Sequence, residues 1–332
     1  MIVHLIFNTI LVFLALSISV EIFLGIFRIK NFRIKYICRA LPFFKIPFDL
    51  IVFTFIGESF FINLNPFSCE IFVYEFLYKL FPAQMPEASN HLIIPQYIAE
   101  QLPVHILSIS TIAVIAVAFL GIMIKLVKLY GSMNYLNGII VNASAYMPTF
   151  KNQKLALDIQ NLKVKILASK EIEIPFAAHN SYIILPLKAV ERLSTDEIEA
   201  VIAHEIQHLK WKDPIFKFII SLISSFCWWI PSRGHVAKLI EDQEQASDAG
   251  ATSYSIDNCI LATAITKILY TSKEPKLNHQ TVCYLASSKK THLNRLEAIL
   301  NDGFFQQGSY IALKDLFVLV CCFLAFLSVW MC

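Results

Sequence analysis

Residues 104–124 carry no formally charged side chain, and this uncharged segment constrains the fold more than any other feature of the sequence. Its 21 residues match the roughly 20 that an α-helix needs to cross the hydrocarbon core of a bilayer. The whole chain is 56% hydrophobic and only 16% charged, with a mean hydropathy of +0.59. One core of this size cannot hide so much apolar surface from water, so a purely soluble globular protein is not favoured.

Three further apolar segments indicate membrane helices. The first 27 residues are largely apolar and precede five basic residues, namely Arg28, Lys30, Arg33, Lys35 and Arg39. Because the positive charge follows the apolar segment, we interpret it as a membrane anchor and not as a cleavable signal peptide. Residues 40–63 form a second, interrupted apolar segment, and residues 316–332 form a short fourth one.

The distribution of lysine and arginine predicts the orientation of these segments. The first loop, residues 28–39, holds five basic residues, whereas residues 64–103 hold only Lys79 among several glutamates. By the positive-inside rule the first loop is cytoplasmic and both termini lie outside the cytoplasmic membrane. The predicted organisation is three membrane helices in residues 1–124 with an outer loop at 64–103, a cytoplasmic domain at 125–314, and a fourth membrane helix at 315–332. The apolar outer loop suits contact with the bilayer or with a separate sensor protein.

The cytoplasmic segment shows a mixed helix and strand pattern. Residues 148–162 have the apolar spacing of a helix, and residues 164–167, 172–176 and 182–185 have the character of short strands. Residues 177–181 lie between the last two and indicate a turn or an edge element. Residues 182–185 are either an edge strand that pairs with an extended substrate or an ordinary core strand.

One predicted helix in this segment carries a metal-binding pattern. Ser194 and Glu197 form a capping box, which predicts a helix from Thr195 to about Lys212, before Asp213-Pro214. His204 and His208 are four residues apart, so both imidazoles project from one face and can bind a single Zn²⁺. Glu205 lies beside them and can act as a general base toward an attacking water.

A third ligand is expected from the acidic stretch at residues 241–248. A helix there places Glu244 and Asp248 on one face. We interpret Glu244 as the third ligand, with Glu241 as the competing candidate, and Asp248 as the group that orients a zinc-binding histidine through its free N–H. The alternative is a solvated acidic helix face without metal.

The remaining candidates carry weaker signals. His179, Asn180 and His235 could stabilise an oxyanion, although a lone histidine is more often structural. Arg295 lies in an amphipathic helical pattern and is interpreted as structural. The eight cysteines contain no C-x-x-C pair, and the net charge of +3 with no basic stripe gives no indication of nucleic acid binding.

The residues quoted above resemble a known family. Residues 184–213, Trp228-Trp229 and the run from Glu244 to Asp248 are similar to the BlaR/MecR-type membrane zinc metallopeptidases, the transducers of β-lactam sensing and their relatives. The resemblance implies an α-helical membrane protein with four transmembrane helices and an inserted cytoplasmic α+β zinc peptidase domain of the HExxH, gluzincin-like kind. It also implies one zinc ion per chain on His204, His208 and Glu244, with Glu205 as the general base and Asp248 in a supporting role.

Two features differ from the family pattern. The chain has Ile230-Pro231 where the family often has Asn-Pro, and Ser247 where it often has cysteine. The β-lactam sensors continue into an extracellular penicillin-binding domain, whereas this sequence ends at Cys332 and has no S-x-x-K site of that kind after its fourth apolar segment. We therefore expect no covalent binding of β-lactam by this sequence.

Three functions follow in order of preference. The first is a membrane zinc endopeptidase that acts in regulated proteolysis or signal transduction, with a cytosolic repressor or a membrane protein as its substrate. The second is a quality-control or processing protease of the HtpX or CAAX type, which is less favoured because those families usually have alanine directly before the aspartate, where this chain has Ser247. The third is a non-catalytic signalling scaffold, against which the intact set His204, Glu205, His208 and Glu244 argues.

Overall fold

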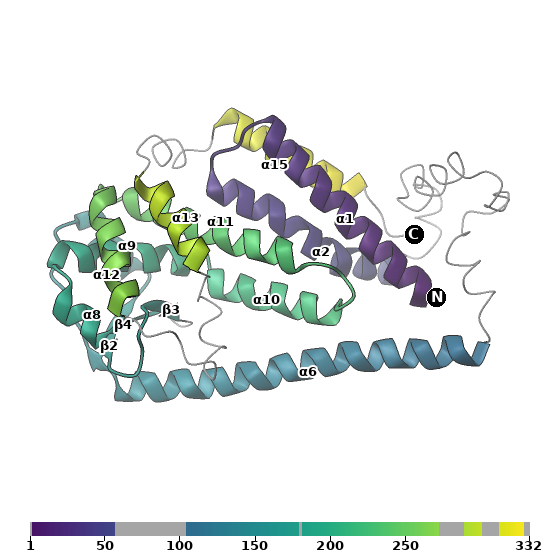
Figure 1. Ribbon diagram of the computed structural model, residues 1–332, viewed down its shortest axis with the longest axis horizontal. Helices are drawn as coiled ribbons and strands as arrows, with labels where there is room; N and C mark the ends of the chain where they lie inside the picture. The colour runs from purple at the N-terminus through teal and green to yellow at the C-terminus, as the bar shows by residue number, and fades with distance from the viewer. Residues whose placement is uncertain (1, 57–103, 179–180, 272–288, 301–311, 329–332) are drawn as a thin grey trace.

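The computed structural model describes residues 2–56, 104–178, 181–271, 289–300 and 312–328, and its described part is mainly helical. Helices α1 (Ile2–Ile26), α2 (Phe32–Ile56) and α15 (Leu313–Ser328) pack together at one side of the molecule. Helix α6 (Val104–Asn142) runs along the opposite side as one long element (Figure 1). The outer loop expected at residues 64–103 lies outside the described residues.

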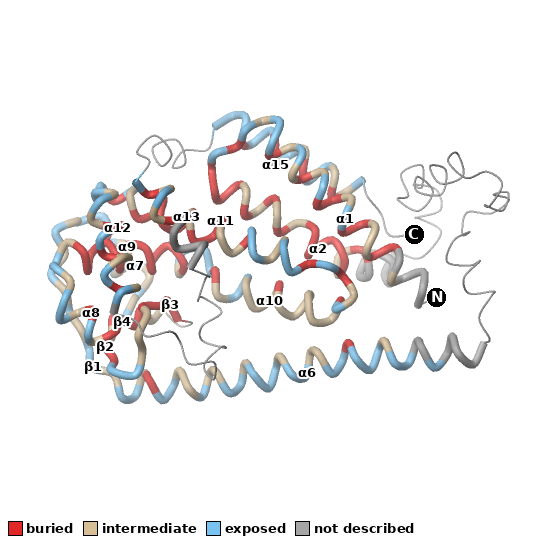
Figure 2. The backbone as a smooth tube through the Cα atoms, in the orientation of Figure 1, coloured by how far each residue is buried: buried red, intermediate tan, exposed pale blue. Residues whose placement is uncertain are grey.

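Two helices are long and apolar enough to cross a bilayer within the described residues. These segments, Asn8–Ile26 and Ile112–Asn142, overlap the first and third predicted spans. Helix α6 exposes apolar side chains such as Ile112, Phe119 and Leu120 along most of its length (Figure 2). A bilayer would cover this surface. Helices α2 and α15 do not meet the same criterion, so four spans remain a prediction.

The predicted loop at residues 28–39 is wrong in its extent, because α2 begins at Phe32. Oδ1 of Asn31 accepts hydrogen bonds from the backbone N–H groups of Arg33 and Ile34, which caps the helix early. Arg33, Lys35 and Arg39 therefore belong to a helix and not to a free basic loop.

Figure 1 shows a small mixed sheet at one end of the molecule, beside α8 (Leu187–Arg192) and α9 (Thr195–Lys210). Its strands are β1 (Ser144–Ala145), β2 (Lys165–Ser169), β3 (Phe176–Ala178) and β4 (Tyr182–Pro186), in the order β1-β2-β4-β3. Strands β2 and β4 are parallel, and the two outer strands are antiparallel to their neighbours. The predicted strands at 164–167 and 182–185 are confirmed within a residue or two.

The third predicted strand, residues 172–176, is wrong except at its end. The strand begins only at Phe176 and includes Ala177 and Ala178, which belong to the segment predicted as a turn or an edge element, so the second of these alternatives is confirmed for them. Pro175 has no N–H to donate to a sheet, which explains why the strand starts only after it. In the described sheet β3 is an edge strand, and β4 lies between β2 and β3.

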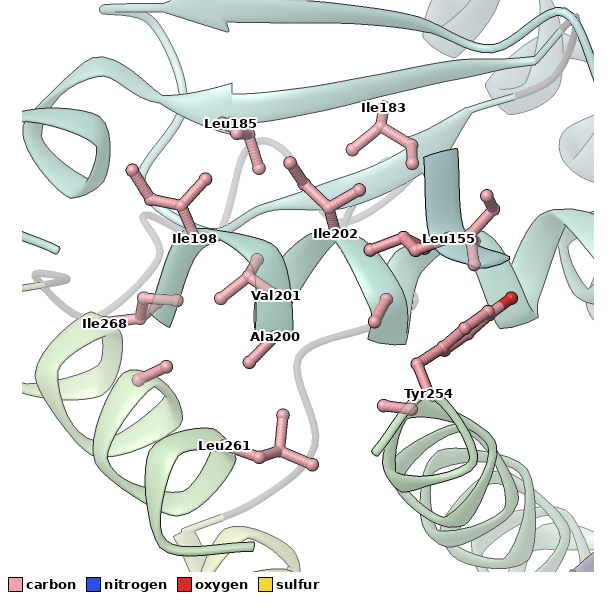
Figure 3. Packing of buried hydrophobic residues seen from close by; sticks show 14 of the residues in the cluster. Leu155, Ile183, Leu185, Ile198, Ala200, Val201, Ile202, Tyr254, Leu261 and Ile268 are labelled. Atoms are coloured by element: carbon pink, nitrogen blue, oxygen red, sulfur yellow. The ribbon is translucent and has the colours of Figure 1, made fainter. Parts of the chain in front are cut away.

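The main hydrophobic core lies between the sheet and helix α9 (Thr195–Lys210). Ile198 and Ile202 of α9 point toward Ile183 and Leu185 of β4 (Figure 3). Helices α7 (Gln153–Asn161), α8 (Leu187–Arg192), α12 (Asn258–Thr271) and α13 (Lys289–Leu300) surround the same core. The helix predicted at 148–162 corresponds to α7, which is shorter. It begins only at Gln153, because Oδ1 of Asn152 caps it by accepting a hydrogen bond from the N–H of Leu155.

A second core joins the N-terminal helices to helices α10 (Asp213–Phe226) and α11 (Arg233–Thr252). Phe13 of α1 and Phe43 of α2 pack with Ile220 of α10 and Leu239 of α11. The N-terminal helices and two of the helices around the predicted metal site therefore share this core.

Candidate metal centre

Helix α9 presents the two histidines as the sequence predicts. Oγ of Ser194 accepts a hydrogen bond from the N–H of Glu197, and Oε2 of Glu197 accepts one from the N–H of Ser194, so the capping box is confirmed. The helix ends at Lys210, and the chain then turns through Lys212 with a φ of 53°. Pro214 stands in the first turn of α10, where its missing N–H costs nothing.

Helix α11 supplies the acidic groups and crosses α9 closely. The side chains of Glu244 and Asp248 are 6% and 0% exposed, so the alternative of a solvated acidic face is wrong. The helices approach each other at Gly250, whose carbonyl accepts a hydrogen bond from Nε2 of Gln207 at 3.2 Å. A Cβ atom on residue 250 would lie 2.5 Å from Cδ of Gln207, so the glycine permits this close approach.

Three candidate ligands converge between the two helices. Nε2 of His204 lies 3.2 Å from Nε2 of His208 and 3.6 Å from Oε2 of Glu244. One donor atom from each of the three residues lies within 4.8 Å of the others. Tetrahedral zinc with Zn–N bonds of about 2.0–2.1 Å separates two nitrogen ligands by about 3.3 Å. The donor set and its spacing therefore fit a zinc ion.

Asp248 lies behind the first histidine. Its Oδ1 is 2.8 Å from Nδ1 of His204, the nitrogen that faces away from Glu244. Arg295 of α13 donates two hydrogen bonds to Asp248, at 2.8 and 2.9 Å, and lies 3.3 Å from Glu244. The guanidinium is 8% exposed, so the interpretation of Arg295 as an ordinary structural residue missed its contact with the site.

Asp213 lies beside His208 in the same way as Asp248 lies beside His204. Its Oδ2 lies 2.8 Å from Nδ1 of His208, and Oγ of Ser247 lies 3.2 Å from the same nitrogen. The sequence indicated Asp213 only as a helix terminator. Its position five residues after His208 is the signal that could have identified it.

The electrostatics of the pocket keep the candidate ligand Glu244 ionised. Burial opposes ionisation of Glu244, but Lys217 and the two histidines hold its pKa well below the usual range. Lys217 and Arg295 each lie 3.3 Å from one of its carboxylate oxygens. Although burial alone would lower the pKa of His204, the charge of Asp248 raises it to about 10, so binding of a metal would have to displace a proton from this imidazole.

A cleft of about 490 Å³ opens beside these residues. Most of its walls come from three elements: α6 with Lys128 and Met133, β3 with Phe176 to Ala178, and α10 with Lys217 and Phe218. His208 and Asp213 form part of its lining. The metal-ligand cluster is therefore accessible from a groove that runs along the edge strand.

The other candidates do not join the cluster. Glu241 is not among the converging ligands. Nε2 of His235 lies 2.7 Å from the carbonyl oxygen of Arg39, and its ring packs against Phe13 and Phe43. His179 and Asn180 lie outside the described residues.

This site has the residues that are typical of zinc-dependent peptidases. Two histidines lie one helical turn apart, a glutamate directly follows the first, and a second helix supplies a carboxylate. Residues 76–299 match the model of the BlaR1 peptidase M56 family, so the chain belongs to this family. The resemblance drawn from the sequence is confirmed. The family is one of membrane-associated metallopeptidases and signal transducers, which favours this class over the HtpX and CAAX types.

Curated relatives agree with the family assignment. The methicillin resistance mecR1 proteins of Staphylococcus aureus and Staphylococcus epidermidis are 26% identical to the chain over 189 residues. The matched segment is 53% of this chain but only 30% of the relatives. The matched part of the chain therefore covers less than a third of the length of these relatives.

Proposed function

We propose that the chain is an integral-membrane zinc metalloendopeptidase that cleaves a protein at the cytoplasmic surface of the membrane. The observation that carries this proposal is the convergence of His204, His208 and Glu244 next to a cleft. Membership in the BlaR1 peptidase M56 family supports it.

The chemistry is divided among residues of α9, α10 and α11. A zinc ion held by His204, His208 and Glu244 would polarise the scissile carbonyl and make water a better nucleophile. Glu205 takes the proton of the attacking water and gives it to the leaving amine. Asp248 and Asp213 fix the rings of the two histidines through their Nδ1 atoms.

The edge strand β3 gives the substrate a place to bind. Phe176, Ala177 and Ala178 line the cleft, and among the described residues β3 pairs with β4 alone. An extended peptide can add to the other edge of β3 and run toward His208. The earlier alternative, in which residues 182–185 form the substrate-binding edge, is wrong because β4 is an inner strand.

Four membrane helices, a cytoplasmic peptidase domain and both termini outside complete the proposal. Single cysteines in a cysteine-free background test it in intact cells. With an impermeant maleimide, Ser89→Cys in the predicted outer loop should react and Lys30→Cys should not. If Lys30→Cys reacted and Ser89→Cys did not, the orientation in the membrane would be the opposite of the one proposed.

The substrate is proposed to be a cytosolic repressor or a membrane protein segment, and the biological role to be regulated proteolysis. A separate sensor protein could act through the predicted outer loop.

The matched pair of wild type and Glu205→Gln tests the activity without a known substrate. New protein N-termini are compared by mass spectrometry in membranes and cytosol of cells that produce either form. We expect new termini that appear with the wild type and are absent with Glu205→Gln, while both proteins bind one zinc ion. Identical sets of termini would refute the peptidase assignment.

A further inference from the structure

Helix α2 reaches the metal-ligand cluster through an arginine that the sequence placed in a loop. Nη1 of Arg33 lies 3.2 Å from Oδ1 of Asp213, while Oδ2 of the same carboxylate lies 2.8 Å from Nδ1 of His208. The two oxygens of Asp213 therefore serve different partners. One partner is a candidate metal ligand, and the other belongs to a helix far away in the sequence.

The salt bridge between Arg33 and Asp213 is buried. The side chain of Asp213 is 1% exposed and that of Arg33 is 11% exposed. A buried hydrogen bond between charged groups is stronger and more directional than one on the surface. Rotation of the Asp213 carboxylate would break its contact with Arg33, so the guanidinium restricts the orientation in which the carboxylate meets His208.

Besides its contact with Asp213, the guanidinium of Arg33 stacks on an aromatic ring. Its Cζ atom lies 4.4 Å from the ring centre of Trp211, which stands between His208 and Asp213 in the chain. The backbone N–H of Arg33 donates to Asn31, which caps α2. Stacking on an aromatic ring and a capped first turn leave the arginine few alternative positions.

A second arginine fixes α2 against the helix that carries the third ligand. Nη1 of Arg39 donates to Asp242, which precedes Glu244 by two residues on α11, and its remaining donors bind Glu21 of α1. The side chain of Asp242 is 6% exposed. Helix α2 is therefore anchored on α11 while its first turn contacts α10.

We propose that Arg33 is a positioning residue, which orients His208 for metal binding through Asp213. The proposal rests on the proposed function, because it presumes that His208 is a metal ligand. It assigns to the N-terminal helices a part in building the metal site, beyond their role as membrane helices. A purely structural salt bridge would affect the stability of the fold but not the geometry of the bound metal.

The test uses the full-length protein in lipid nanodiscs. The zinc-free form is titrated with Co²⁺, whose visible absorption reports ligand geometry, and the affinity for Zn²⁺ is measured by competition with a chelator. Arg33→Met is compared with Lys30→Met, which removes the same charge from an exposed position near α2. We expect Arg33→Met to weaken Zn²⁺ binding about 10- to 100-fold and to change the Co²⁺ spectrum, while Lys30→Met behaves as the wild type.

A double-mutant cycle decides whether Arg33 acts through Asp213. In an Asp213→Asn background, Arg33→Met should change Zn²⁺ affinity less than about twofold, because the carboxylate on which it acts is gone. Equal effects of Arg33→Met in both backgrounds would overturn the proposal, as would a wild-type Co²⁺ spectrum in Arg33→Met.

A conservative variant covers the case in which Arg33→Met does not fold. Arg33→Lys keeps the charge but lacks the planar fork of donors. We expect it to melt as the wild type does and to bind Zn²⁺ with an affinity between those of the wild type and Asp213→Asn. Affinity and spectrum identical to those of the wild type would overturn the proposal. If the wild type itself binds neither metal, the proposed function fails first, and the two failures are distinguishable.

Discussion

Nε2 of His204 lies 3.2 Å from Nε2 of His208, although each imidazole has its other nitrogen beside a buried aspartate. If both aspartates are ionised and accept protons from the Nδ1 atoms, the two Nε2 atoms face each other as lone pairs. Such an arrangement repels unless a proton or a cation lies between the nitrogens. The two aspartates thus prepare the histidines to bind a metal.

The choice of Glu244 as the third ligand is tested against Glu241 as its matched control. Both glutamates lie on α11, but only Glu244 belongs to the converging cluster. Glu244→Ala should abolish stoichiometric zinc binding, whereas Glu241→Ala should bind zinc as the wild type does. Metal analysis of the purified variants measures this, and the reverse pattern would show that the wrong carboxylate was assigned.

Asp248→Asn removes the negative charge next to His204 and keeps the shape of the side chain. We expect zinc affinity to fall about 10- to 100-fold, because the aspartate orients the imidazole and raises its basicity. Chelator competition measures the affinity. An unchanged affinity would mean that Asp248 serves only to bind Arg295.

Arg295→Met leaves two buried carboxylates, Asp248 and Glu244, without their common cation. Removing one member of a buried ion pair costs about 3–5 kcal/mol of stability. The thermal unfolding temperature of the zinc-free protein should therefore drop markedly, and zinc should restore part of the loss by neutralising Glu244. A variant as stable as the wild type in both forms would contradict the role of this arginine.

Glu197 stabilises α9 through the capping box and a salt bridge with Lys267 at 2.7 Å. Burial opposes ionisation, yet Lys267 and the N–H of Ser194 lower the pKa of Glu197 below its usual value. Because the folded-state pKa is lowered, this stabilisation is fully present above the unfolded pKa of about 4.3 and is lost as the pH falls through the folded value.

The variant Glu197→Ala should accordingly lose about 1 kcal/mol of stability at pH 7 from the capping box. The difference from the wild type should shrink below about pH 4, where the unfolded pKa lies. Thermal unfolding at several pH values measures this. A difference that grows on acidification would reverse the assigned sign.

The parts of the site that the sequence predicted depend on local spacing. The Ser194 capping box fixes where α9 starts, and the helical period then places His204 and His208 on one face. Glu244 and Asp248 follow from the same rule within α11. These relationships span at most a few turns of one helix, so no tertiary contact was needed to infer them.

What the sequence could not provide are the contacts between distant segments. Arg295 meets Asp248 across 47 residues, and Arg33 meets Asp213 across 180. An isolated arginine in an amphipathic pattern carries no signal for its partner. Likewise, β3 begins only after Pro175. The alternation of apolar and polar residues alone therefore does not identify the strand that lines the cleft.

The zinc site is tested most directly by X-ray absorption at the zinc edge on the full-length protein reconstituted with one equivalent of Zn²⁺. The assignment predicts four-coordinate zinc with two imidazole nitrogens and oxygen ligands, all at about 2.0–2.2 Å, and no sulfur. A sulfur shell at about 2.3 Å would assign the metal to the cysteines of this chain and contradict the site. Failure of the protein to retain zinc would contradict it equally.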